Sequence, residues 1–401
     1  MQPPRRTIDH PLVWGIVAAL LCPLVLQAAA NDSSAIYSEA LKEAVKASWD
    51  KGGMFVPYVP WQREGGWWVS KGPPRFVLAP KLDDPNAVTY LIGVLHNGPG
   101  WTAADLGFAV EPPWAAGKRR TPIVERRIET WQRGREKDAA RFNHCARCYA
   151  ALALGAIGDH RAFEPLLQLL QTQQEHPSEP GFESPLEDKY PLWWYAAEGL
   201  GRLGDDRAVQ PLVEALQRKP SAVCIYAIAR FRDSRTILPL LAAADADPKV
   251  DEYVNSALHH ILRVRFRHLG GSGKMKIAEF PELGGELSRG RDNRKVWRRF
   301  LEVGRDRAEA GFRESYGRYA RVRKESPEKT AAIKSQVSAI TRWGIAELPL
   351  MMEKIAEGDT SLVPSVSELV DGKVAPDATQ AQCLAWWQAN KERWLIPFDG
   401  L

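Results

Sequence analysis

Apolar residues recur at helical spacing in a short stretch near the middle of the chain, YAAEGLGRLGDDRAVQPLVEAL at residues 195–216. Ala196, Leu200 and Leu203 follow one another at i, i+4 and i+7, which places them on one face of an α-helix. A second apolar stripe starts at Leu212, after a Gly-Asp turn. The pattern predicts two short helices that face each other across that turn.

The residues of the turn have the properties that such a connection needs. Gly204 suits the left-handed residue that ends a helix. Asp205 or Asp206 can accept hydrogen bonds from the unpaired amides of the next helix. Pro211 falls near the start of the second helix, where a missing N–H costs least.

The same pattern occurs more than once. Residues 149–170, YAALALGAIGDHRAFEPLLQLL, align with the first stretch at an offset of 46 positions. A weaker third copy, AIARFRDSRTILPLL, lies 28 positions further on, and VDEYVNSALHHILRV retains the first helix of a fourth. The turn residues that correspond in the two best copies are Gly158, Asp159 and Arg161 in one, and Gly204, Asp205 and Arg207 in the other.

Helix pairs this short cannot bury their apolar faces alone, so successive pairs are expected to stack into a superhelix with a continuous core. The spacing A-x-x-x-L-G-x-[IL]-G-D-x-R-A-x-x-P-L resembles the short HEAT-like repeats of phycobilisome lyase-type and related bacterial proteins. It is well matched at residues 147–171 and 193–218 and loosely at 222–266. The resemblance implies an all-α, armadillo-type α-solenoid. Families of this kind are mostly scaffolds that bind proteins or ligands, with a minority of enzymes.

The first thirty residues have the pattern of a secretory signal peptide. Arg5 and Arg6 precede an apolar run at residues 11–26, and Ala28 to Ala30 offer small residues for cleavage. We expect an exported protein, periplasmic or extracellular, that touches a membrane only if this signal stays uncleaved.

Residues 31–140 are expected to form an irregular cap rich in Trp, Pro and Gly. Trp61, Trp67 and Trp68, together with Trp101 and Trp114, could stack on sugar faces. The favoured alternative is that they cover the exposed end of the solenoid, whose last repeat has no neighbour.

The remaining segments follow from composition. Repeats are expected at 141–268, with an insertion at 171–194 that is a candidate contact loop, and a glycine-rich linker at 269–288. The helical segment at 289–330 is basic, with 13 basic and five acidic residues between positions 289 and 324. The C-terminal segment at 331–401 is expected to form a helix pair with a Trp-rich tail.

Two of these segments hold candidate binding residues. Arg298 and Arg299 could contact an anionic envelope component, although a solvated helix is the favoured interpretation of the basic segment. Trp386 and Trp387 could form a hydrophobic lid on the last repeat or, if exposed, a docking site.

Net charge argues against a dedicated nucleic-acid binder, because 54 basic and 49 acidic residues leave only +5. Cys145 and Cys148 form a C-x-x-C that predicts structural thiols or a disulfide, without the second ligand pair that a zinc site would need. The adjacent His259 and His260 cannot easily face one ion, so no metal or other cofactor is expected.

No Ser-His-Asp, Cys-His or paired-carboxylate arrangement can be assembled, so no catalytic residue is assigned. The sequence therefore predicts a non-catalytic scaffold of the bacterial cell envelope that binds a protein partner along its solenoid. A lyase-type enzyme or a tetrapyrrole-holding protein is one alternative. A glycan-binding module that uses the N-terminal tryptophans is another.

Overall fold

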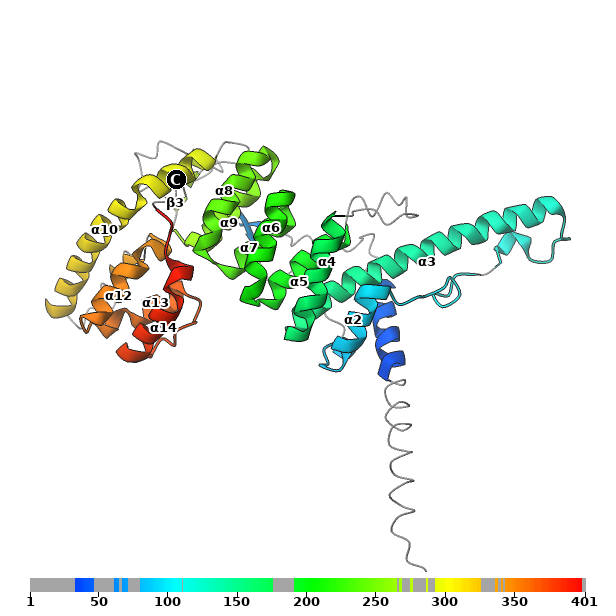
Figure 1. The fold of residues 1–401 in the computed structure, drawn as a ribbon, viewed down its shortest axis with the longest axis horizontal. Coiled ribbons are helices and arrows are strands. Elements are labelled where there is room, and N and C mark those ends of the chain that lie inside the picture. Colours follow the sequence, from blue (N-terminus) through cyan, green and yellow to red (C-terminus); the bar gives the residue numbers. More distant parts are fainter. Residues whose placement is uncertain are drawn as a thin grey trace, which may run out of the picture. The chain divides into compact units, whose positions relative to one another are not determined.

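Figure 1 shows the helices and strands of a computed structural model of the chain. The chain divides into two compact units. The first comprises Met1–Val56 and Phe76–Pro165, and the second comprises Pro57–Arg75 and Leu166–Leu401. The residues that the structure describes are 33–46, 61–64, 67–70, 80–109, 111–175, 191–264, 267–268, 275–276, 286–287, 293–325, 336–337, 340–341 and 343–398. The segment predicted as a signal peptide, the centre of the predicted 171–194 insertion and most of the predicted glycine-rich linker lie outside these residues.

The described part of the first unit is helical. Its elements are a helix at residues 33–46, η1 (Pro80–Leu82), α2 (Ala87–Asn97), η2 (Pro113–Ala115), α3 (Pro122–Ile157) and η3 (His160–Ala162). Helix α2 packs against α3. Leu41, Leu91 and Leu95 are fully buried and belong to the core of this unit.

Helix α3 is longer than the sequence pattern predicts. It begins at Pro122, after Thr121 accepts a hydrogen bond from the Val124 amide, and it ends at Gly158, whose φ of 76° is left-handed. The boundary that we predicted at residue 140 therefore falls inside one continuous helix. The C-terminal part of α3 is buried, whereas the N-terminal part is largely exposed.

The repeats of the second unit stack as predicted. Helix α5 packs against α7 and α7 against α9, while α6 packs beside α8. The elements are α5 (Leu192–Leu203), η4 (Asp206–Ala208), α6 (Val209–Arg218), α7 (Ala222–Phe231), η5 (Ser234–Thr236), α8 (Ile237–Ala246), η6 (Pro248–Val250) and α9 (Asp251–Leu262). Helix α4 (Phe163–Glu175) spans the boundary between the two units. This arrangement confirms the prediction of an all-α fold of the α-solenoid type.

One turn geometry recurs at five of the helix connections that the structure describes. An aspartate caps a short 3-10 turn by accepting a hydrogen bond from the amide two residues later. The five aspartates are Asp159, Asp205, Asp233, Asp247 and Asp359. In the first three, the arginine at that second position also donates from its guanidinium to the same carboxylate.

The C-terminal part of the second unit contains a further helix pair of the same kind. It consists of α12 (Leu348–Ala356), η9 (Thr360–Leu362) and α13 (Val363–Leu369), and it is preceded by η8 (Gly344–Glu347) and by the long α10 (Arg294–Glu325). Helix α14 (Gln380–Trp394) packs against α12 and against η5. This helix pair lies within residues 331–401, the segment in which we predicted one.

Short strands depart from the expected irregular cap and linker. Antiparallel β1 (Trp61–Glu64) and β2 (Trp67–Ser70) pair Trp61 with Ser70 and Glu64 with Trp67, and β2 contacts α9. The runs are separated by Gly65-Gly66, a dipeptide common in two-residue hairpin loops. Within the linker, β3 (Arg267–His268), β4 (Met275–Lys276) and β5 (Glu286–Leu287) form a second small sheet.

No helix among the described residues is both long enough and apolar enough to cross a membrane.

Candidate binding surfaces

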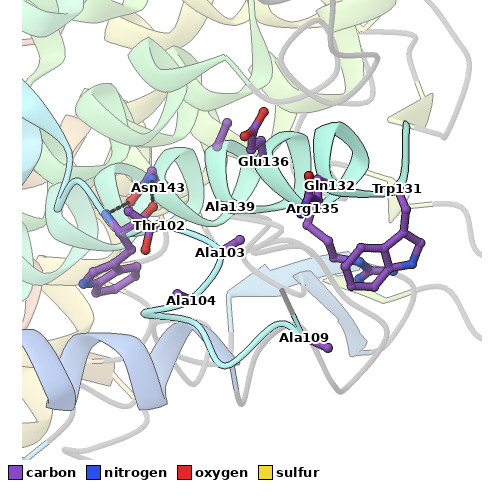
Figure 2. A pocket seen from close by; sticks show the side chains of 12 residues that line it. Thr102, Ala103, Ala104, Ala109, Trp131, Gln132, Arg135, Glu136, Ala139 and Asn143 are labelled. Carbon is purple, nitrogen blue, oxygen red and sulfur yellow. Dashed lines mark hydrogen bonds between the residues drawn. The ribbon is translucent and has the colours of Figure 1, made fainter. Parts of the chain in front are cut away.

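A groove of about 560 Å³ lies in the first unit, between α3 and the loop at residues 101–109. Its volume falls in the range of small-molecule sites, or of sites for one or two anchoring side chains. Figure 2 shows Trp131 and Arg135 at one end of the groove and Asn143 and Thr102 at the other. The wall between them consists largely of small side chains, namely Ala103, Ala104, Ala109, Ala139 and Ala140.

Polar groups at the Asn143 end are used internally. The Trp101 amide donates to Asn143 Oδ1, and Asn143 Nδ2 donates back to the Trp101 carbonyl, both at 2.9 Å. Trp101 Nε1 donates to Ser38 Oγ at 3.2 Å, and its ring is buried. These hydrogen bonds hold the loop at residues 101–109 against α3 and the helix at residues 33–46, so we assign this end of the groove to the fold.

At the other end of the groove, the Arg135 side chain contacts two aromatic rings. The Arg135 guanidinium lies 4.9 Å from the centre of the Trp131 ring and 5.7 Å from that of Phe108. Arg135 also forms an ion pair with Asp138, with 3.3 Å between Nη1 and Oδ2. The groove therefore offers apolar walls and one oriented cation, and the described residues give it no nucleophile–base pair.

A buried carboxylate links two repeats in the second unit. Glu198 of α5 is 1% exposed, and its Oε1 accepts hydrogen bonds from Arg202 Nε at 2.9 Å and Arg230 Nη2 at 2.8 Å. Burial lowers the pKa of Arg202, and the Glu198 carboxylate partly offsets that effect. Removing one member of a buried ion pair costs about 3 to 5 kcal/mol. We therefore assign Glu198 to repeat packing.

A second charged cluster joins the repeats to the C-terminal helices. Asp371 forms ion pairs with both Arg232 and Arg263. These three are the described non-glycine residues with positive φ, at 56°, 50° and 54° respectively. Arg232 Nε also donates to His260 Nε2 at 3.1 Å. We call Arg232, Arg263 and Asp371 the arginine clasp.

The structure separates the predicted aromatic residues. Trp61, Trp67 and Trp68 lie on the β1–β2 hairpin. Trp101 offers no platform for sugars, the less favoured of the two alternatives, because its ring is buried. Trp114 is contacted by Lys118 and Arg127, whose cationic groups lie 5.7 and 4.7 Å from its ring centre.

Arg298 and Arg299 of α10 both have acidic neighbours. Arg298 pairs with Asp245 of α8, and Arg299 Nη1 lies 2.7 Å from Glu302 Oε2. Other arginines of α10 are paired as well, namely Arg294, Arg313, Arg318 and Arg323. This supports the interpretation of a solvated helix whose charges are balanced within the chain.

The tryptophans of α14 contribute to packing. Trp394 is buried, and the Trp386 ring lies 6.2 Å from it and 6.4 Å from the Trp387 ring, centre to centre. Trp386 and Trp387 themselves are half-buried. A lid role fits this packing, and binding through the exposed parts of these rings stays a prediction.

The disulfide allowed by the C-x-x-C pattern is not formed, because Cys145 and Cys148 are free, buried thiols within α3. Cys148 Sγ instead lies 3.6 Å from His144 Nε2. Burial raises the pKa of Cys145 to about 11, so this thiol is protonated at neutral pH.

The paired histidines of α9 belong to the packed interior. The His259 ring lies edge-on to Trp297, with 5.1 Å between ring centres. Burial lowers the pKa of His259 to about 3 and that of His260 to about 4. Among the described residues, no group of three His, Cys, Asp or Glu side chains is placed to hold a metal ion.

One surface, the exposed side of α3, is not predicted by the sequence pattern. Residues 118–141 contain nine basic and four acidic side chains, a net charge equal to that of the whole chain. The start signal was present in the sequence, since Thr121 followed by Pro122 is a typical helix N-terminus. The high Pro, Gly and Trp content of the preceding segment concealed it.

Stacked helix pairs with aspartate-capped turns define a HEAT-like repeat protein. The family described as PBS lyase HEAT-like repeat matches residues 146–172 and 194–218, so the chain contains repeats of this family. These are the two repeats that the sequence pattern predicts best. Searches of the curated proteins and of the solved structures find no significant match.

Proposed function

We propose that this chain is a non-catalytic scaffold of the bacterial cell envelope that holds a protein partner along its HEAT-like repeats. The observation that carries the proposal is the surface formed by α6 and α8. These neighbouring helices each expose one face, while the middle of α7, from Cys224 to Ala229, is fully enclosed.

The exposed faces of α6 and α8 correspond position by position. Gln210 and Glu214 of α6 lie 28 positions before Leu238 and Ala242 of α8, the offset between the second and third repeats. Gln210, Glu214 and Ala242 are exposed, and Leu238 is half-buried. We call these four residues the repeat face. An exposed face that recurs from one repeat to the next suits an extended protein contact.

The experiment is affinity capture from the native envelope fraction with the mature chain as bait, compared between two variants. Ala242→Arg places a long cation on the repeat face, whereas Ala385→Arg makes the same change on the exposed side of α14. Wild type and Ala385→Arg should retain one protein that Ala242→Arg loses. Retention by all three baits would contradict the repeat face, and capture of no protein would contradict the scaffold.

The proposed location rests on the N-terminal pattern of residues 1–30. Cell fractionation should find the chain outside the cytoplasm, with a mature N-terminus near Asn31. Trp101 is buried, so it cannot contribute to the alternative of glycan binding. The alternative of an enzyme or a tetrapyrrole-holding protein stays a prediction, and no contact among the described residues supports it.

A further inference from the structure

The exposed side of α3 separates positive from negative charge. At 100° per residue, Arg126, Arg133 and Lys137 lie within about 40° of one another around the helix axis. Three of the four acidic residues between positions 118 and 141 (Glu125, Glu129 and Glu136) group together about 80° away, and the fourth, Asp138, lies about 120° away in the other direction. All three cations are exposed, and the buried Ile128, Ala139 and Phe142 lie on the opposite side. We call Arg126, Arg133 and Lys137 the α3 basic stripe.

These cations are not neutralised by the described residues. Arg135, on the inner side of α3, and Arg141, which lies about 40° from Lys137 around the axis, both pair with Asp138. Arg126, Arg133 and Lys137 form no ion pair within the described part of the chain. The stripe thus differs from the basic helix α10, where most of the arginines have an acidic neighbour.

Apolar groups lie beside the cations. Ile123 is 74% exposed, the highest value among the described large hydrophobic residues, and it projects about 60° from Arg126 around the axis. Trp114 lies next to this helix start, between the cationic groups of Lys118 and Arg127. A tryptophan with cationic neighbours and an exposed aliphatic side chain is the composition of an interfacial lipid contact.

We propose that the α3 basic stripe, with Ile123 and Trp114, binds the surface of an anionic phospholipid bilayer. The stripe runs for about 16 Å along the helix, so several headgroups can be contacted at once. Ile123 favours a lipid surface over a soluble acidic protein, because an exposed aliphatic side chain gains from partitioning into the acyl boundary. The inference goes beyond the scaffold function, since it concerns a different unit and a different class of partner.

The test is sedimentation of the mature chain with vesicles of phosphatidylcholine alone, or of phosphatidylcholine mixed with phosphatidylglycerol. Binding is expected only to the phosphatidylglycerol vesicles, and it should weaken as salt is added. The variant R126E/R133E/K137E should lose at least about tenfold in affinity. The control R313E/R321E/K324E makes the same charge change on exposed positions of α10 and should bind like wild type.

A second variant separates lipid from other anions. Ile123→Ser should weaken vesicle binding about threefold while leaving binding to soluble polyglutamate unchanged. The proposal is overturned if wild type ignores anionic vesicles, if both triple variants lose binding equally, or if Ile123→Ser has no effect on vesicles. Circular dichroism of each variant checks that the helices are retained. The assay contains no protein partner, so its failure leaves the scaffold proposal standing.

Discussion

Single residues at close helix contacts decide whether neighbouring repeats can approach. Gly201 of α5 faces α7, and a Cβ built on it would lie 2.8 Å from the Ala227 Cα atom. A Cβ atom added to Gly134, in the exposed part of α3, would have no atom of a neighbouring segment within 4 Å. Both residues are helical, so the two positions differ mainly in the space available.

Gly201→Ala is therefore expected to lower the free energy of unfolding by about 1 to 3 kcal/mol, because backbone atoms of α7 must move away. Gly134→Ala should raise it by about 0.5 to 1 kcal/mol through the better helix propensity of alanine. Chemical denaturation of both variants measures the difference. Equal effects of the same sign would show that α5 and α7 are not in close contact.

The residue at the end of the first helix explains why the third and fourth repeats match the sequence pattern less well than the second. The left-handed helix end that Gly204 provides in the second repeat is occupied by Arg232 in the third and Arg263 in the fourth. A sequence pattern that expects glycine there loses its strongest signal. The ion pairs of both arginines with Asp371 can offset the strain of this backbone conformation. Asp371 lies more than a hundred residues further along the sequence, so a local pattern does not include it.

At the scale of elements, α14 is attached to the repeat turns by polar contacts. Arg393 donates to both carboxylate oxygens of Asp206, at 2.8 and 2.7 Å, and Ser234 Oγ donates to the Leu395 carbonyl at 2.5 Å. Arg393 also donates to the Phe231 carbonyl. Its guanidinium thus joins η4, the end of α7 and α14.

Arg393→Ala should lower stability by about 1 to 2 kcal/mol, a value reduced by the exposure of Asp206. Hydrogen exchange should become faster in α14. Arg313→Ala serves as a control, since this arginine of α10 is largely exposed and its nitrogen lies 3.9 Å from the Glu309 carboxylate. Unchanged protection of α14 in Arg393→Ala would contradict this attachment.

The helices and strands differ in how well they can be predicted from the sequence. The two best repeats combine apolar periodicity with a Gly-Asp turn, and the whole pattern occurs in both, so several signals agree. The hairpin β1–β2 and the first half of α3 each had one local signal, Gly65-Gly66 and Thr121-Pro122, and both were outweighed by composition. The α3 basic stripe follows from the helical wheel only after that helix is known to continue through residues 122–140.

At the scale of the whole molecule, the buried histidines make stability depend on pH. The folded-state pKa values, about 3 for His259 and about 4 for His260, lie below the ordinary value of 6.5. Burial is the main cause, and Arg230, Arg232 and Arg263 lower the pKa of His260 further. Between pH 6.5 and 4 the unfolded histidines bind protons that the folded ones do not, so stability falls as pH decreases.

The expected slope is about 1.4 kcal/mol per pH unit for each histidine in that window. Denaturant titrations at several pH values measure it. His260→Gln should reduce the slope, whereas the same change at His160, which lies on the exposed η3 turn, should leave it as in wild type. A wild-type stability that is independent of pH across this window would contradict the buried state of both histidines.

We expect the stacked repeats to present one continuous face to a protein partner. The most direct measurement places a photo-crosslinking amino acid at Gln210 or Ala242 of the repeat face, or at the exposed Ala385 of α14, in living cells. Positions 210 and 242 should capture the same protein, and position 385 should not. Crosslinks to unrelated proteins, or none from either repeat helix, would contradict this expectation.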